Sequence, residues 1–207
     1  MGCHKNNHAH PCQHSSSTCS DSEFILHKYI DFPKLTCLNE KAENSCLKIF
    51  TRQPKSIIDA EFVESDADEA LLFFIPFTGL VILKSIIIMG AGDLTEYPKT
   101  VKLYPNKEGL DFENVEDFEA AQTIDLVADV NGLVKYPINV CKFQNVWSLN
   151  LYFSHNFGAE STKISFIGLS GEFRQAKKDL GFTLYELNPN PSDHKLEGFG
   201  SFTPQLT

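Results

Sequence analysis

The chain has 207 residues, of which 42% are apolar, and it carries a formal net charge of −9 with an isoelectric point near 5.2. This length is enough for one domain with a substantial core. The acidic balance argues against direct nucleic-acid binding and against a polybasic membrane contact, because both need clustered Lys and Arg.

The first twenty residues are polar and contain little that could form a core. We therefore expect residues 1–20 to be a disordered tail without a secretory signal, since they lack an apolar segment. The tail is rich in potential ligands of soft metals, but no pair has the spacing of a structural zinc site, so adventitious binding is favoured over a metal centre. These ligands are Cys3, His4, His8, His10, Cys12, His14 and Cys19.

From residue 24 onward apolar residues become frequent. Residues 24–35 predict a segment that lies against the body of the domain, residues 37–45 a turn, and residues 47–50 and 57–58 weak short elements. Two strongly apolar stretches follow, at 71–77 and 80–89, separated by Pro76 and Thr78-Gly79. Short runs rich in β-branched and aromatic residues predict two buried strands rather than helices.

The second half of the chain continues the strand pattern. Residues 101–104 predict a short strand, and residues 107–121 an acidic, mostly loop-like insertion. The Asn131-Gly132 pair predicts a hairpin between strands at 123–127 and 133–140. Further strands are expected in 143–154, at 163–169 with a continuation through 171–173, and at 182–187. Many short strands with almost no helix predict an all-β sandwich or jelly roll.

The acidic loop that precedes the first apolar stretch is a candidate functional site. Its carboxylates are Glu64, Asp66, Asp68 and Glu69. Carboxylates at this spacing could bind a cation or a basic partner protein, but the segment lacks the Gly and the distal Glu of an EF-hand loop. The alternative is a solvated turn whose side chains hydrogen-bond the local backbone.

The insertion is a second acidic segment, because residues 108–119 contain six carboxylates and no basic residue. Such a block is commonly a solvated face and can also be an interaction segment. Together, the two acidic segments predict a negative side that prefers basic partners.

No catalytic, cofactor-binding or metal-binding constellation emerges from the sequence, so we expect a protein that is not an enzyme. His27, His155 and His194 have no neighbouring nucleophile motif, and Cys37, Cys46 and Cys141 form no Cys-x-x-Cys pair. The six cysteines do not suggest a disulfide framework. We expect reduced thiols in a cytoplasmic and nuclear protein.

Several motifs in order resemble the PITH domain family, named for proteasome-interacting thioredoxin. They lie at residues 62–69, 75–79, 86–90, 142–146, 156–159, 162–163 and 167–169. The resemblance covers roughly residues 20–190 and implies a galactose-binding-domain-like jelly roll, with a PITH domain at 21–192 and a flexible C-terminal tail at 193–207. In thioredoxin-like relatives this domain docks on the 26S proteasome.

The resemblance favours a non-enzymatic interaction module that associates with the proteasome or another protein assembly, as a monomer, with Glu64, Asp66, Asp68 and Glu69 as the candidate partner-binding loop. No redox activity is implied, because no thioredoxin motif is present. The alternative is a ligand-binding module for carbohydrate or Ca²⁺, as galactose-binding-like folds often are.

Overall fold

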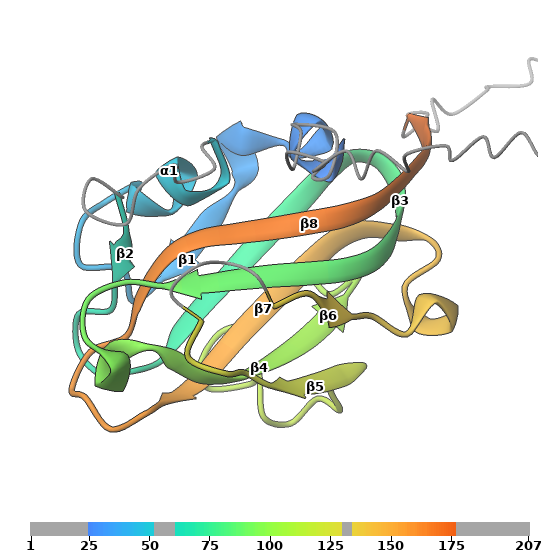
Figure 1. Cartoon of the computed structure of the whole chain (residues 1–207). Helices are drawn as coiled ribbons and strands as arrows, with labels where there is room; N and C mark the ends of the chain where they lie inside the picture. The colour runs from blue at the N-terminus through green and yellow to red at the C-terminus, as the bar shows by residue number, and fades with distance from the viewer. Residues whose placement is uncertain (1–24, 52–60, 130–133, 177–207) are drawn as a thin grey trace, which may run out of the picture. The chain divides into compact units, whose positions relative to one another are not determined.

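One long strand, β3 (Leu71–Gly90), runs through both layers of the domain in a computed structural model that describes residues 25–51, 61–129 and 134–176. Its first half pairs with β7 (Val146–Asn156) and with β1 (Thr36–Leu38). Its second half pairs with β8 (Lys163–Ala176) and with β6 (Tyr136–Pro137). Figure 1 shows β3 turning back between the two halves, so that each half belongs to a different layer.

The remaining elements extend these layers or cover them. β4 (Pro98–Pro105) pairs with β7 and carries β5 (Gln122–Asp125) on its far side, while β2 (Val63–Glu64) pairs with β8. The helical elements are α1 (Ser45–Thr51) and the 3₁₀ turns η1 (Ile25–Tyr29), η2 (Phe32–Lys34), η3 (Leu94–Glu96) and η4 (Val140–Lys142). All sheet pairing among the described strands is antiparallel.

The main core lies between the two layers and follows from the alternation of side chains along each strand. From the first half of β3, Leu71, Phe73 and Ile75 point into this core, and their neighbours Leu72 and Phe74 point to the outer face. In the same layer, β7 adds Phe153, the cross-strand partner of Leu71. The second half of β3 and β8 contribute the facing residues, including Leu83 and Ile167. The all-β sandwich predicted from the sequence is therefore confirmed.

The prediction of two separate strands at 71–77 and 80–89 is wrong, because both stretches belong to β3. Pro and Gly commonly end a strand, but here the ladder with β7 shifts register between Pro76 and Val81 and then continues. A local irregularity of this kind bends a strand without ending it. The bend is what lets one strand serve both layers.

The hairpin predicted around Asn131-Gly132 is also wrong in its pairing. β5 pairs with β4, and β6 pairs with β3. A side chain joins the two segments instead: Gln122 donates a hydrogen bond to the Pro137 carbonyl at 3.0 Å and accepts one from the Asn139 N–H at 2.9 Å. The turn itself lies outside the described residues.

Two other strand predictions are confirmed. The strands at 101–104 and 163–169 are present, and β8 continues through 171–173 as expected. The weak element at 47–50 is the helix α1, whose Ile49 and Phe50 are buried in the main core. The elements at 57–58 and 182–187, the tail at 1–20 and the domain boundary at 192 lie outside the described residues. No helix in the described ranges is long and apolar enough to span a membrane.

Candidate functional site

The acidic loop is organised around a residue outside it, Asn39, whose backbone has a positive φ of 67°. The Asn39 Nδ2 donates hydrogen bonds to the Ala70 carbonyl at 2.7 Å and to the Asp68 Oδ1 at 2.8 Å, and its Oδ1 accepts one from the Ala67 N–H at 3.0 Å. The backbone joins in, because the Asp66 N–H donates to the Asn39 carbonyl at 3.0 Å. The Asn39 side chain therefore holds residues 67–70 in place.

Two of the four predicted site residues are occupied by contacts within the chain. Glu64 lies 3.1 Å from the Lys41 ammonium and 4.0 Å from that of Lys163. Asp68 accepts hydrogen bonds from Asn39 and, at 3.0 Å, from the N–H of Ala70. This arrangement matches the alternative interpretation, in which polar side chains stabilise the local turn.

The carboxylates of the other two residues are less engaged by the described parts of the chain. Asp66 is exposed, and its carboxylate makes no contact with the described parts of the chain. The Glu69 carboxylate lies 3.5 Å from the Nδ1 of the exposed His155. The contacts thus divide the predicted set into a structural pair, Glu64 and Asp68, and a less engaged pair, Asp66 and Glu69.

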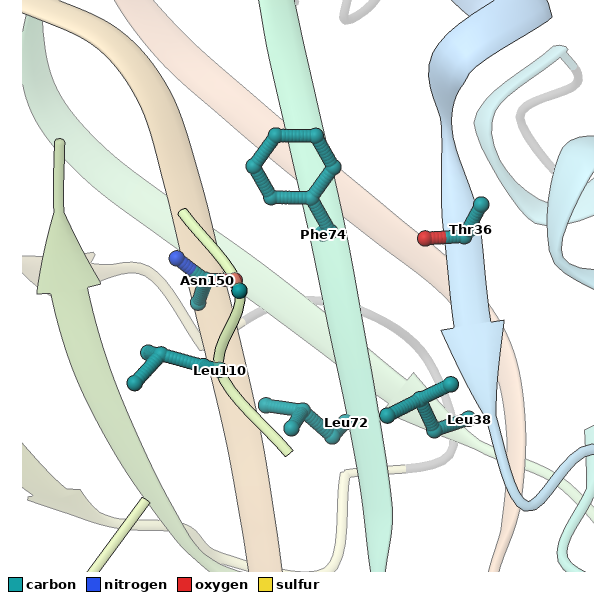
Figure 2. A pocket seen from close by; sticks show the side chains of 7 residues that line it. Thr36, Leu38, Leu72, Phe74, Leu110 and Asn150 are labelled. Atoms are coloured by element: carbon teal, nitrogen blue, oxygen red, sulfur yellow. The ribbon is translucent and has the colours of Figure 1, made fainter. Parts of the chain in front are cut away.

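An apolar hollow of about 180 Å³ lies beside this loop, on the outer face of the β1–β3–β7 layer. Leu72 and Phe74 of β3 form its floor, and Thr36 and Leu38 of β1 line one side. Asn150 of β7 and the Gly109-Leu110 segment of the insertion line the other side (Figure 2). We call this hollow the β3 groove. The sequence analysis did not predict it, because it depends on four segments far apart in the chain.

The insertion forms one wall of the β3 groove because it is anchored to the sheet. Its Leu110 and Val115 pack with Leu72, Tyr104 and Tyr152 in a small second core on the outer face. Asn150 adds a polar anchor, since its Nδ2 donates to the Lys107 carbonyl at 2.8 Å. The insertion also caps itself, because the Asp111 Oδ1 accepts hydrogen bonds from the N–H groups of Glu113 and Asn114.

The electrostatics of Tyr152 show that the two acidic segments converge on this face. The pKa of Tyr152 is raised above its ordinary value, first by burial and then by the negative charges of Glu116, Asp68 and Glu69. Glu116 belongs to the insertion, and the other two belong to the acidic loop. Carboxylates from two segments more than forty residues apart therefore lie near the same buried Tyr152 ring. The described residues contain no group of three or more His, Cys, Asp or Glu side chains that could hold a metal ion.

The family of the chain follows from its sequence, which matches the PITH domain over residues 16–189. The chain belongs to the PITH domain family. PITH domain-containing protein 1 of Xenopus laevis is 42% identical over 184 residues, which cover 88% of this chain and 86% of that protein. The protein of the same name from Dictyostelium discoideum is 38% identical over 202 residues, covering 96% and 100%. The Homo sapiens protein is 41% identical over 181 residues, covering 87% and 83%.

Solved structures similar to this PITH domain confirm the predicted galactose-binding-like fold. The CBM32-1 and CBM32-2 domains of Clostridium perfringens ZmpB, in complex with GalNAc, match with a TM-score of 0.52 at 14% identity, over 70% of this chain and 35% of that one. A fucolectin from Morone saxatilis serum matches with a TM-score of 0.52 at 12% identity, over 73% and 49%. This chain thus spans about half or less of those solved chains, and at such identities the likeness concerns the fold alone.

Proposed function

We propose that this PITH domain is a non-catalytic protein-interaction module that associates with the proteasome or another protein assembly in the cytoplasm and nucleus. The observation that carries the proposal is the convergence of the acidic loop and the insertion on one face, around an apolar hollow. Protein interfaces combine an apolar centre with a polar rim, and a negative rim favours basic partners.

The state of the buried titratable groups supports a non-catalytic role. Burial raises the pKa of Cys37 well above its ordinary value, and burial with the nearby Glu40 charge raises that of Cys46 to about 12. The thiolate is the reactive form of cysteine, so both thiols are inert at neutral pH. Burial also lowers the pKa of His27 to about 4, which removes it as a proton donor near pH 7.

The proposal is tested by capture from cytosol with the full chain as bait, at low and moderate salt, and identification of the partners by mass spectrometry. We expect proteasome subunits or the subunits of one other assembly, in amounts that fall as salt rises, because salt screens exposed charges. If folded bait enriches no assembly, or enriches one independently of salt, docking through the acidic face is wrong.

The second candidate is binding of a carbohydrate or Ca²⁺, which the fold similarity motivates. The β3 groove itself does not favour it, because this hollow, at about 180 Å³, is smaller than the ~300–1,000 Å³ of typical small-molecule sites. A thermal-shift screen with monosaccharides and CaCl₂ decides the matter, since a ligand of the folded state raises the melting temperature by mass action. A flat screen removes this candidate.

A further inference from the structure

The size of the β3 groove suits one apolar side chain. Its volume of about 180 Å³ is close to the ~150 Å³ cavity that holds a single benzene molecule in a well-studied case. Its floor is formed by Leu72 and Phe74, so a side chain that enters would contact hydrocarbon on that side. Pockets at the centre of an interface are where a single anchor residue contributes most to binding.

One polar group in the groove is left for a ligand. Asn150 is 1% exposed, and its Nδ2 is occupied by the Lys107 carbonyl. Its Oδ1 accepts no hydrogen bond from the described residues, although the side chain lines the groove. An amide oxygen is a hydrogen-bond acceptor, so a backbone N–H of a bound segment could donate to it from the groove.

Carboxylates lie close in sequence to the residues that line the groove. Asp66 and Glu69 belong to the loop that leads directly into the first residues of β3, next to Leu72. Glu108 and Asp111 immediately flank the lining residues Gly109 and Leu110. The basic residue of this stretch, Lys107, directs its ammonium over the Phe118 ring, 4.6 Å from the centroid. The charge around the groove is thus complementary to Lys and Arg.

We propose that the β3 groove binds an extended segment of a partner protein, which inserts one Leu- or Phe-sized side chain over Leu72 and Phe74. The same segment donates an N–H to the Asn150 Oδ1 and carries Lys or Arg on both sides of its anchor. The inference rests on the proposed function and names the chemistry of the partner.

The probe is a fluorescent nine-residue peptide with the sequence Ser-Lys-Lys-Thr-Leu-Thr-Lys-Lys-Ser, titrated into the full chain. Replacing its central Leu by Ala is expected to weaken binding at least tenfold, and replacing its Lys residues by Glu to abolish it. Thr36→Trp fills the groove from β1 and should also weaken binding at least tenfold. Leu38→Lys should also weaken binding of the Leu peptide at least tenfold, because it places a positive charge at the mouth of the β3 groove.

The matched control is Thr123→Trp. Thr123 is also exposed on a strand, pairs with Lys102 of β4, and lies three strands from β3, or about 14 Å at ordinary strand spacing. This variant should bind the Leu peptide within twofold of the original chain. Equal melting temperatures for the Trp variants exclude misfolding, and Leu38→Lys gives an independent answer if Thr36→Trp does not fold.

Several results would overturn the inference: no binding of the Leu peptide, equal binding of the Leu and Ala peptides, or equal binding by the groove variants and the original chain. A dimer that Thr36→Trp dissociates would also overturn it, because a second copy would then occupy the groove. Failure of the proposed function looks different, since the original chain would then capture no assembly from cytosol. If Thr36→Trp captures the same assembly as the original chain, the module function stands and only the groove assignment fails.

Discussion

The side chain of Asn150 in β7 holds the acidic insertion against the sheet through its hydrogen bond of 2.8 Å to the carbonyl of Lys107. This contact fixes the place where the insertion leaves β4, and with it the position of Gly109 and Leu110 beside β3. The wall of the β3 groove therefore depends on a buried amide forty-three residues away in the chain.

Asn150→Leu tests this dependence. It keeps the side-chain volume and removes the hydrogen bond, which contributes about 1 kcal/mol in typical cases. We expect a loss of that size in the free energy of unfolding, and faster amide hydrogen exchange in residues 109–118. Exchange in β8 should be unchanged. If the insertion exchanges as slowly as in the original chain, the hydrogen bond does not position it.

Asn39 should have a larger effect, because its side chain makes four hydrogen bonds and its backbone has a positive φ. Asn39→Gly tolerates the backbone conformation and loses only the hydrogen bonds, so we expect a destabilisation of about 2 kcal/mol. Asn39→Ala adds the cost of the left-handed conformation, about 1 kcal/mol more. Chemical denaturation measures both, and an Ala variant no less stable than the Gly variant would contradict this ranking.

His27 predicts a pH dependence of stability. It lies between the Phe50 and Phe166 rings and accepts a hydrogen bond from the Leu169 N–H through its Nε2. Burial lowers its pKa from 6.5 to about 4, so between these values the unfolded chain binds a proton that the folded chain does not. Stability contributed by neutral His27 is complete above about pH 6.5 and is lost as the pH falls toward 4, by at most about 3 kcal/mol.

The comparison for this prediction is His27→Gln, which cannot titrate in that range. Its free energy of unfolding should vary less between pH 6.5 and 4 than that of the original chain, whatever its absolute stability. Parallel curves for the two proteins would show that His27 is not the group responsible.

We predict that Gly171 is needed for the close packing of β8 against β3. A Cβ at this position would lie 1.9 Å from the Ile82 carbonyl oxygen on the neighbouring strand. Gly171→Ala should therefore force β3 and β8 apart and cost about 1–3 kcal/mol, the range for overpacked sites. Differential scanning calorimetry should show a lower melting temperature, and an unchanged value would mean that the strands separate without strain.

The apolar runs made the strands and the all-β class predictable, because a buried strand needs β-branched and aromatic residues on both faces. The same runs gave a wrong strand boundary at Pro76. Proline is compatible with a strand only at a local irregularity, and the sequence gives no sign of the one found here. The Asn131-Gly132 signal is local, whereas the choice of partner for β5 and β6 depends on β4 and β3.

The candidate site was predictable only in part. Clustered carboxylates identified the acidic loop, but nothing local distinguishes Asp68, which Asn39 engages, from Asp66, which is left exposed. Asn150 gave no signal, because a lone Asn on an alternating strand is expected at the surface, and only the covering insertion buries it. Sites formed by distant segments become visible once the register of the sheet is known.

The most direct test of docking through the acidic face is a quantitative capture experiment with two charge-reversed baits. One carries Asp66→Lys and Glu69→Lys, at the less engaged pair of the acidic loop. The control carries Asp125→Lys and Glu172→Lys, which change the net charge equally at exposed positions on β5 and β8. The first bait should lose at least nine-tenths of the captured assembly at moderate salt, and the control should retain most of it. Equal recovery by both folded baits would contradict docking through this face.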